Sequence, residues 1–363
     1  RSAGLAMITN RSGGVTGSRP PVRRRTSRWA GRGVAQLIVM VLVAEVVMAA
    51  TTVQALLAGP VRHPAPRPSL PVVKPAFPAT TRFYTDPHNP AATWVRDHPR
   101  DRRAAAIGRR IAAEPQAAWL TETNESLIEE RARHLVRTAA AHRRLPVLVA
   151  YAIPQRDCEQ LSSGGAGDVA AYRRWSDALA RGIGRGRTIV ILEPDALAHM
   201  SCLKRRQRAE RFAALSYAAR ALQRGAPRAR IYYDAGNSGW LPARTMAERL
   251  RRAGVERYGD GIAVNVSNFN ATADEVRYGL SVVREVRRPH LGVVIDTSRN
   301  GAGPTRNHRF CDPPGRKLGR PPTAATGIPG VDAFLWIKQP GQADGCAAGA
   351  GMFVPGYAYR LTR

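Results

Sequence analysis

The sequence predicts an α/β fold in which about seven parallel strands form a barrel, with an active-site cleft at the carboxyl ends of the strands. Apolar runs of strand length alternate with helical segments, which is typical of parallel strands covered on both faces. Five of these runs end on an acid or an amide, in the strings VLVAYAIPQRDC, TIVILEPDAL, ARIYYDAGNSGW, GIAVNVSNF and GVVIDTSRNG. Barrels of this kind assemble their active sites at the carboxyl ends of the strands. The converging acids therefore indicate an enzyme that uses acid/base chemistry.

The elements follow from the same alternation. Strands are expected near 82–85 and at 145–153, 187–193, 229–234, 261–267, 291–296 and 331–338. Helices are expected at 103–113, 124–142, 168–183, 203–224, 242–253 and 272–287. Residues 300–330 are rich in Gly and Pro, so no regular structure is expected there. Irregular segments of this length are usually functional.

The chain divides into three parts. Residues 1–59 carry a basic start and an apolar stretch, the order found in a secretory signal or a membrane anchor. Glu45 interrupts the apolar stretch and weakens the reading as a spanning helix. Residues 60–82 form a Pro-rich linker, and residues 83–363 form the catalytic domain. We expect a secreted or cell-surface protein whose only membrane contact would be an uncleaved N-terminal anchor.

The net charge of +29 comes almost wholly from arginine, since only Lys74, Lys204, Lys317 and Lys338 are lysines. A basic chain can bind nucleic acid or a membrane surface. No nucleic-acid-binding motif is present, however, and the aromatic residues are not interleaved with the basic ones as stacking platforms would require. The charge therefore indicates a compositional bias with arginines on solvated helix faces, and no nucleic-acid partner is expected.

Four cysteines allow three disulfide pairings or four free thiols. Cys158 and Cys202 follow the ends of consecutive strands, and Cys311 and Cys346 bracket the last strand. Cys158–Cys202 and Cys311–Cys346 is therefore the economical pairing, in keeping with an exported protein.

Three carboxylates are the candidates for chemistry. Asp195 directly follows a buried strand, so burial and a nearby Asp157 would raise its pKa and let it donate a proton. Its alternative role is to cap the next helix. Asp157 follows Arg156, which would keep it ionised or form only a surface salt bridge. Asp344 lies in the Gly-flanked string GQADGC, where an ordinary turn is the alternative.

Trp119, Trp240 and Trp336 lie at expected element ends, where their faces could stack on sugar rings, although core packing is the default for any one of them. Trp240 follows a Gly-containing string and is the best candidate for exposure. His199 and His308 have no partner at ligand spacing, so neither a metal site nor a cofactor is expected.

Taken together, these strings resemble glycoside hydrolase family 6, the inverting cellulases that act on β-1,4-glucan. The likeness covers about 83–360 and includes YAIPQRDC, SSGGA, ILEPDALA, YYDAGNSGW, VNVSNF, VIDTSRNG, CDPPGR and DAFLWIKQPGQADGC in the family's order. The four cysteines fall where the family has two disulfides. The resemblance implies a distorted barrel of about seven strands and an endoglucanase-like enzyme of the actinobacterial type.

The resemblance also implies roles for individual residues. It makes Asp195 the general acid and Asp157 the acid that tunes it, with Ser163 in the same loop. Asp234 would support the site, Asp344 would be the proposed base, and Tyr151 would lie beneath the distorted sugar ring. The expected substrate-binding residues are Trp119, Trp240, Asn265, Asn268, Phe310, Lys338, Gln342, Arg156 and Asn237.

Three positions depart from the family pattern and concern substrate binding. Asn237 stands where many members have His, Phe310 where they usually have Trp, and Gln342 where they usually have Glu. The segment between Asn300 and Val331 is short beside that of tunnel-forming members, which favours an open cleft. We therefore expect a monomeric endo-β-1,4-glucanase; a cellobiohydrolase and a non-catalytic glucan-binding barrel are the alternatives.

Overall fold

The computed structural model describes residues 76–363. The expected signal or anchor at 1–59 and the linker up to residue 75 lie outside the described residues. Between residues 76 and 363, no helix is both long and apolar enough to cross a membrane.

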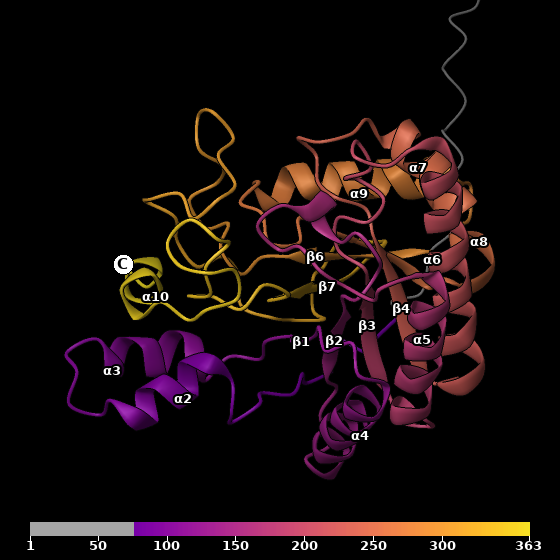
Figure 1. Cartoon of the computed structure of the whole chain (residues 1–363). Helices are drawn as coiled ribbons and strands as arrows, with labels where there is room; N and C mark the ends of the chain where they lie inside the picture. Colours follow the sequence, from indigo (N-terminus) through magenta and orange to yellow (C-terminus); the bar gives the residue numbers. More distant parts are fainter. Residues whose placement is uncertain (1–75) are drawn as a thin grey trace, which may run out of the picture. The chain divides into compact units, whose positions relative to one another are not determined.

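Seven parallel strands form one curled sheet in which every strand pairs with its neighbour in the sequence. One backbone hydrogen bond joins the two ends of the sheet: the N–H of Ala117 donates to the carbonyl of Trp336 at 2.9 Å. The sheet is therefore a distorted barrel, as predicted (Figure 1). The strands are β1 (Ala118–Leu120), β2 (Val147–Ala150), β3 (Thr188–Leu192), β4 (Ala229–Asp234), β5 (Gly261–Val264), β6 (Gly292–Asp296) and β7 (Val331–Leu335).

The first strand is not where the sequence predicted it. Near 82–85 the chain makes only a single parallel bridge between Phe83 and Leu145. The first strand of the sheet is instead β1, whose three residues pair with Leu148–Ala150 of β2. An apolar segment this short has too little pattern to identify it as a strand.

Helices cover the outer face of the sheet, and a smaller cluster lies to one side (Figure 1). The outer helices are α4 (Glu125–Ala141), α5 (Val169–Ile183), α6 (Arg205–Gly225), α7 (Ala243–Arg252), α8 (Val255–Tyr258) and α9 (Thr272–Val286). The side cluster contains α2 (Pro90–Asp97), α3 (Ala104–Ile107), the π-helical turn η1 (Gly108–Ala112) and α10 (Pro355–Leu361). The helix predicted at 103–113 is thus split between α3 and η1.

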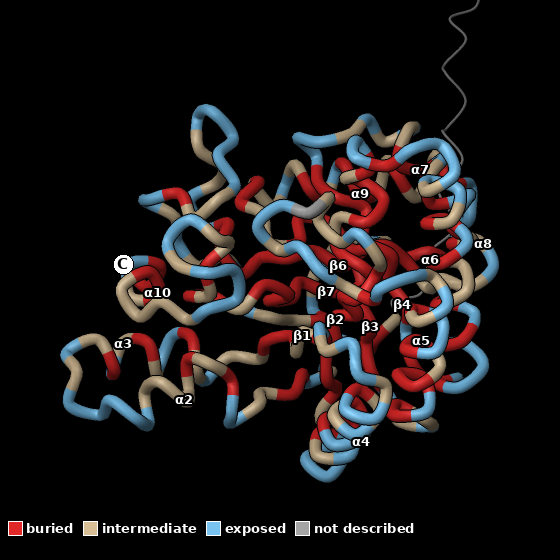
Figure 2. Tube along the Cα trace, viewed as in Figure 1, coloured by how far each residue is buried: buried red, intermediate tan, exposed pale blue. Residues whose placement is uncertain are grey.

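Most strand residues are buried (Figure 2), and alternation along the strands separates their side chains into two apolar layers. In β2, Val147 and Val149 face the barrel interior, whereas Leu148 and Ala150 face the helices. Phe77 belongs to the interior cluster, and the N–H of Ala76 donates to Asp332 Oδ1 at 3.0 Å. The two-sided burial explains why the strands read as continuous apolar runs.

Two strands, β3 and β5, end earlier than predicted where the next residue takes a left-handed backbone conformation. Positive φ angles occur at Glu193 directly after β3 and at Asn265 directly after β5, and also at Gln155, Asp157 and Asp195 in the turns that follow β2 and β3. Such residues cannot continue a strand. The chain therefore turns sharply at the carboxyl ends and presents polar side chains there.

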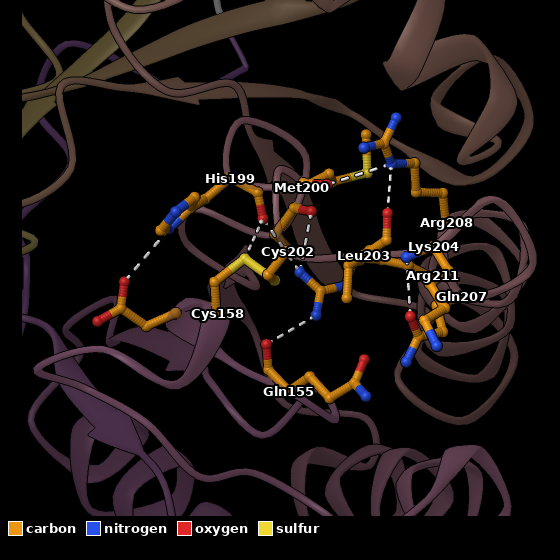
Figure 3. The surroundings of a disulfide bond; sticks show 12 residues. Gln155, Cys158, His199, Met200, Cys202, Leu203, Lys204, Gln207, Arg208 and Arg211 are labelled. Carbon is orange, nitrogen blue, oxygen red and sulfur yellow. Dashed lines mark hydrogen bonds and ion pairs between the residues drawn. A yellow bond between two sulfur atoms is a disulfide. The ribbon is translucent and has the colours of Figure 1, made fainter.

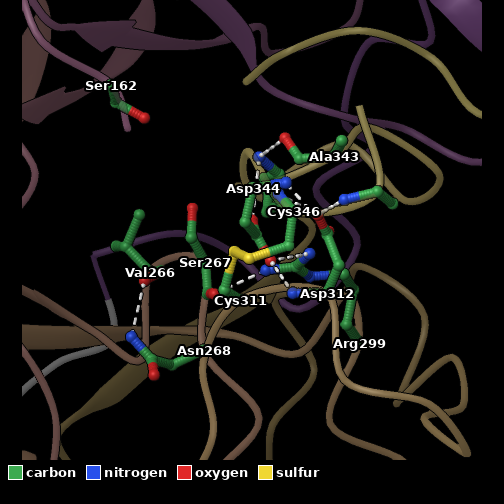
Figure 4. A network of polar contacts seen from close by, with 12 residues as sticks. Ser162, Val266, Ser267, Asn268, Arg299, Cys311, Asp312, Ala343, Asp344 and Cys346 are labelled. Carbon is green, nitrogen blue, oxygen red and sulfur yellow. Dashed lines mark hydrogen bonds and ion pairs between the residues drawn. A yellow bond between two sulfur atoms is a disulfide. The ribbon is translucent and has the colours of Figure 1, made fainter. Parts of the chain in front are cut away.

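Two disulfides join these loops, in the pairing that the sequence predicted. Cys158–Cys202 links the loops after β2 and β3 (Figure 3). Cys311–Cys346 links the irregular 300–330 segment to the loop after β7 (Figure 4).

Candidate active site

A cleft of about 970 Å³ lies at the carboxyl ends of the strands. It brings together most of the residues that the sequence nominated, although they come from loops far apart in the chain. Those that line it are Trp119, Tyr151, Arg156, Asp157, Ser163, Asp195, Asn237, Trp240, Asn268, Phe310, Lys338, Gln342 and Asp344. Asp234 and Asn265 lie outside this lining and are buried.

Asp195 reaches the cleft from the turn after β3 and is only partly exposed. Its backbone N–H donates to Asp234 Oδ2 at 3.0 Å. Burial raises the pKa of Asp195 well above its usual value, and the negative charges of Asp234 and Asp157 raise it further. Both effects favour the protonated form of the Asp195 carboxyl group, which is the form that a proton donor must have.

Two buried carboxyl groups stabilise the turn that carries Asp195. Asp234 also accepts the N–H of Gly236 at 3.0 Å, and burial raises its pKa. Glu193 accepts the N–H groups of Ala152 and Ile153, and burial raises its pKa to about 7. Glu193 was missed in the sequence because an acid inside an apolar run looks like one more strand-end residue.

Asp157 is positioned by its own loop and by a histidine. Its Oδ2 accepts the N–H of Ser162 at 2.8 Å, and its Oδ1 lies 3.5 Å from Nδ1 of His199. The expected salt bridge to Arg156 is not formed. Arg156 instead donates to the carbonyls of Tyr151, Ser162 and Ser163 at 2.6–3.0 Å. The guanidinium of Arg156 therefore donates to backbone carbonyls, which orders the loop, and it does not pair with a carboxylate.

Asp344 lies between two cations, Arg299 and Lys338. Figure 4 shows Asp344 with Arg299 and Asp312. Arg299 Nη1 is 2.8 Å from Oδ2, and Lys338 Nζ is 3.1 Å from Oδ1. Burial alone would raise the pKa of Asp344, but Arg299 and Lys338 together hold it below its usual value. The backbone N–H of Asp312 donates to Asp344 Oδ2 at 3.2 Å, and the backbone N–H of Asp344 donates to Asp312 Oδ1 at 2.8 Å, so two reciprocal bonds position Asp344. Asp344 is therefore an ionised carboxylate and not a simple turn residue.

Arg299 is the main site residue that sequence reasoning missed. Its side chain is fully buried, stacks 4.4 Å from the ring of Phe269, and donates to the hydroxyl of Tyr357 at 3.2 Å. Its position in VIDTSRNG, one turn after a strand end, was the only signal.

Aromatic side chains lie along the cleft as expected. Trp119 packs edge-on against Tyr151, with ring centroids 5.1 Å apart, and its Nε1 donates to Ile337. Trp240 is 38% exposed and Phe310 56% exposed, so both offer faces to a ligand. Trp336, in contrast, is buried and donates to the carbonyl of Arg320, which makes it a core residue.

The amide side chains fall into two groups. Asn237 accepts from Gly239 and Asn270 at 3.0 Å and still lines the cleft, as do Asn268 and Gln342. Asn265 does not: it is fully buried and donates to the carbonyl of Asp296 at 2.9 Å. The expectation that Asn265 binds substrate is corrected to a supporting role, because its amide bonds hold the loop after β5. Among residues 76–363, no three His, Cys, Asp or Glu side chains are grouped to hold a metal ion.

Comparisons with known proteins agree with this geometry. Residues 78–353 match the model of glycosyl hydrolases family 6. Endoglucanase A of Thermobispora bispora is 44% identical over 288 residues, which cover 79% of this chain and 63% of that protein. Endoglucanase 1 of Streptomyces sp. (strain KSM-9) is 46% identical over 269 residues, 74% of each chain.

A solved structure is also similar. The endoglucanase Cel6 from Mycobacterium tuberculosis, in complex with methyl-cellobiosyl-4-deoxy-4-thio-β-D-cellobioside, superposes with a TM-score of 0.73 at 40% identity. The match covers 81% of this chain and 98% of that one. With the family model spanning the described barrel and its cleft, the chain belongs to glycosyl hydrolase family 6.

Proposed function

We propose that this chain is an endo-β-1,4-glucanase that hydrolyses β-1,4-glucosidic bonds in cellulose or a related β-glucan, with inversion of configuration. The endoglucanases among its relatives and the cellobioside-derived ligand of the Mycobacterium tuberculosis enzyme support this substrate class. We further propose that it acts as a secreted or cell-surface monomer.

The observation that carries the proposal is the contrast between two carboxyl groups in one cleft. The pKa of Asp195 is raised by burial and by Asp234 and Asp157, whereas Arg299 and Lys338 outweigh burial and lower that of Asp344. Glycoside hydrolysis by inversion needs one protonated carboxyl group and one ionised carboxylate across the scissile bond. Opposed pKa shifts are how one site holds both forms at the same pH.

The proposed roles follow. Asp195 protonates the leaving oxygen, and Asp157 keeps it protonated by electrostatic repulsion. Asp344 acts at the end of the site where water attacks, although its two cations weaken it as a base. Asp234 supports the turn beneath Asp195, and Ser163 belongs to the loop that carries Asp157.

The remaining lining residues are proposed to bind the glucan. Tyr151 lies beneath a sugar ring, and Trp119, Trp240 and Phe310 stack on successive rings. The polar contacts to sugar hydroxyls come from Asn237, Asn268, Lys338 and Gln342.

Carboxymethyl-cellulose tests the proposal directly when viscosity and reducing ends are followed together. Attack inside chains should lower the viscosity steeply for each reducing end released. Asp195→Asn, which keeps the size of the side chain, should lower the rate on unactivated glucan by about 10²–10⁴. A substrate with a very acidic leaving group should be affected less, because it needs less proton donation.

Three outcomes would count against parts of this proposal. Slow loss of viscosity with cellobiose as the early product would indicate exo attack. Equal loss on both substrate types would remove Asp195 as the acid. No hydrolysis of any β-glucan by the wild-type chain would reject the function itself.

A further inference from the structure

The loop after Asp195 is enclosed by arginine side chains. We call residues 195–203 the Asp195 loop. Six of its backbone carbonyls, those of Ala196, Leu197, Ala198, His199, Met200 and Leu203, accept from three arginines of helices α6 and α7. Each backbone carbonyl needs a partner when it is removed from water. These arginines therefore take the place of the hydrogen bonds that a strand or helix would supply.

Two of the three arginines contact this loop alone. Arg208 donates from Nε to Met200 and Leu203 at 3.2 and 2.8 Å. Arg249 donates from Nη1 to Leu197 and Ala198 at 2.6 and 3.1 Å. Neither is hydrogen-bonded to the loop after β2.

Arg211 differs because its guanidinium contacts two loops (Figure 3). Nη1 lies 3.4 and 3.5 Å from the carbonyls of Ala196 and His199. Nη2 donates to the carbonyls of Pro154 and Gln155 at 2.8 and 2.9 Å. We call residues 154–163 the Asp157 loop. One planar group on helix α6 therefore joins the Asp157 loop to the Asp195 loop.

Arg211 is a buried cation, so the folded state requires partners for the donors of its guanidinium. The residue is 4% exposed and forms no salt bridge with any residue of the described chain. Burial lowers its pKa, and the negative charge of Glu193 acts in the opposite direction. A buried cation is tolerated only when its donors are satisfied. Here backbone carbonyls satisfy them, so the guanidinium and both loops depend on the same geometry.

The hydrogen bonds of Arg211 lie close to the Cys158–Cys202 disulfide, which links the same two loops covalently. Arg211 binds just before Asp157 in the chain, and the Cys158–Cys202 disulfide links the loops just after it. Asp157 is thus held from both sides against the loop that carries Asp195. A fixed spacing matters because a misplacement of about 1 Å between reacting groups can lower the rate by about 10²-fold.

We propose that Arg211 is a positioning residue that sets the separation between Asp157 and Asp195 by binding the carbonyls of both loops. This inference rests on the proposed function, since it gives these two carboxyl groups their catalytic meaning. Arg211 itself touches neither the substrate nor the reacting atoms.

A pH profile can separate positioning from simple stabilisation. The charged groups that act on Asp195 are Asp234, Asp157, Lys338 and Asp344. Of these, only Asp157 lies on one of the two loops that Arg211 joins. If that loop loosens, Asp157 repels the Asp195 carboxylate less, so the pKa of Asp195 falls. The basic limb of the rate profile should then move to lower pH.

Arg211→Lys is the test variant because it keeps the positive charge and loses the fork that reaches both loops. Arg208→Met and Arg249→Met are matched controls, because each removes carbonyl bonds from the Asp195 loop alone. On an unactivated cello-oligosaccharide, Arg211→Lys should lower kcat by about 10–100-fold with little change in KM. Its basic limb should shift to lower pH. The two controls should lower the melting temperature and leave the limb in place.

The outcomes are distinguishable. An Arg211→Lys enzyme with wild-type kcat and an unshifted limb would overturn the inference while leaving the proposed function intact. The same limb shift in Arg208→Met would also overturn it, because that variant leaves the Asp157 loop untouched. Failure of both Arg211→Lys and Arg211→Met to fold would assign Arg211 to folding and not to positioning. A wild-type chain inactive on every β-glucan would reject the proposed function first.

Discussion

Replacing Arg299 with methionine would test whether the ion pair between Arg299 and Asp344 keeps the Asp344 carboxylate ionised and stabilises the fold. Arg299 Nη1 lies 2.8 Å from Asp344 Oδ2, and the side chain is fully buried. Methionine keeps much of the length and apolar contact of the side chain but removes the charge. Among residues 76–363, Lys338, 3.1 Å from the other carboxylate oxygen, would be the one cation left in an ion pair with Asp344.

The expected loss can be worked out from these contacts. Removing one partner of a buried ion pair lowers stability by roughly 3–5 kcal/mol. The remaining Lys338 places this case at the lower end, whereas loss of the stacking on Phe269 adds about 0.5–2 kcal/mol. We therefore expect Arg299→Met to lower the free energy of unfolding by about 4 kcal/mol at neutral pH.

The loss should also depend on pH with a defined sign. The native pKa of Asp344 is lowered, so its contribution to stability is complete above the unfolded pKa of about 3.9. That contribution is lost as the pH falls through the native pKa. In Arg299→Met the native pKa rises. The difference in stability between wild type and variant should therefore be largest near neutral pH and should shrink below about pH 4.

Urea unfolding followed by circular dichroism at several pH values gives these free energies. The control is the same substitution in an Asp344→Asn background, which completes a double-mutant cycle. In that background Arg299→Met should be much less harmful, because no carboxylate is left unpaired. Equal losses in both backgrounds and at all pH values would refute the reasoning and assign the effect of Arg299 to packing.

Three further predictions concern the cleft and its loops. Cys158→Ser with Cys202→Ser should lower the free energy of unfolding by about 4 kcal/mol, from the 44-residue separation, and denaturant midpoints that match the wild type would contradict this. Phe310→Trp should lower KM on long cello-oligosaccharides by enlarging an exposed stacking face, without changing kcat; an unchanged KM would remove Phe310 from the binding surface. The first product seen by NMR should be the α-anomer, since one water attack inverts a β-linkage, and an initial β-anomer would exclude the inverting mechanism.

The sequence was most informative where chemistry and topology coincide. Acids in the loops that follow parallel strands lie at one end of the sheet, so the sequence alone predicts that Asp195, Asp157 and Asp344 lie near one another. The predicted number of strands was correct, but the strand expected near 82–85 is absent from the sheet and β1 (Ala118–Leu120) takes its place. Some strand lengths were wrong, because a left-handed residue such as Asn265 ends β5 while the apolar pattern continues at Val266.

The buried arginines could not be predicted. The chain has many arginines, and no local sequence pattern distinguishes the buried Arg211 and Arg299 from those that are exposed to solvent. What distinguishes them is the set of carbonyls and carboxylates that surround them in space. Arg156 shows the opposite error: its neighbour in sequence, Asp157, suggested an ion pair, whereas three backbone carbonyls bind its guanidinium.

The left-handed residues at the strand ends bear on how this enzyme can be made more heat-resistant. Each such non-glycine residue carries roughly 1–3 kcal/mol of conformational strain. At Asp157 and Asp195 that strain is inseparable from function, because glycine would relax the backbone and delete the acid. Arg143 and Arg287 share the conformation at the ends of α4 and α9, and neither lines the cleft. Glycine at these two helix ends would relieve the backbone strain and leave the catalytic residues unchanged. Substitutions that raise the melting temperature without loss of activity are therefore expected at the helix ends and not in the loops that carry Asp157 and Asp195.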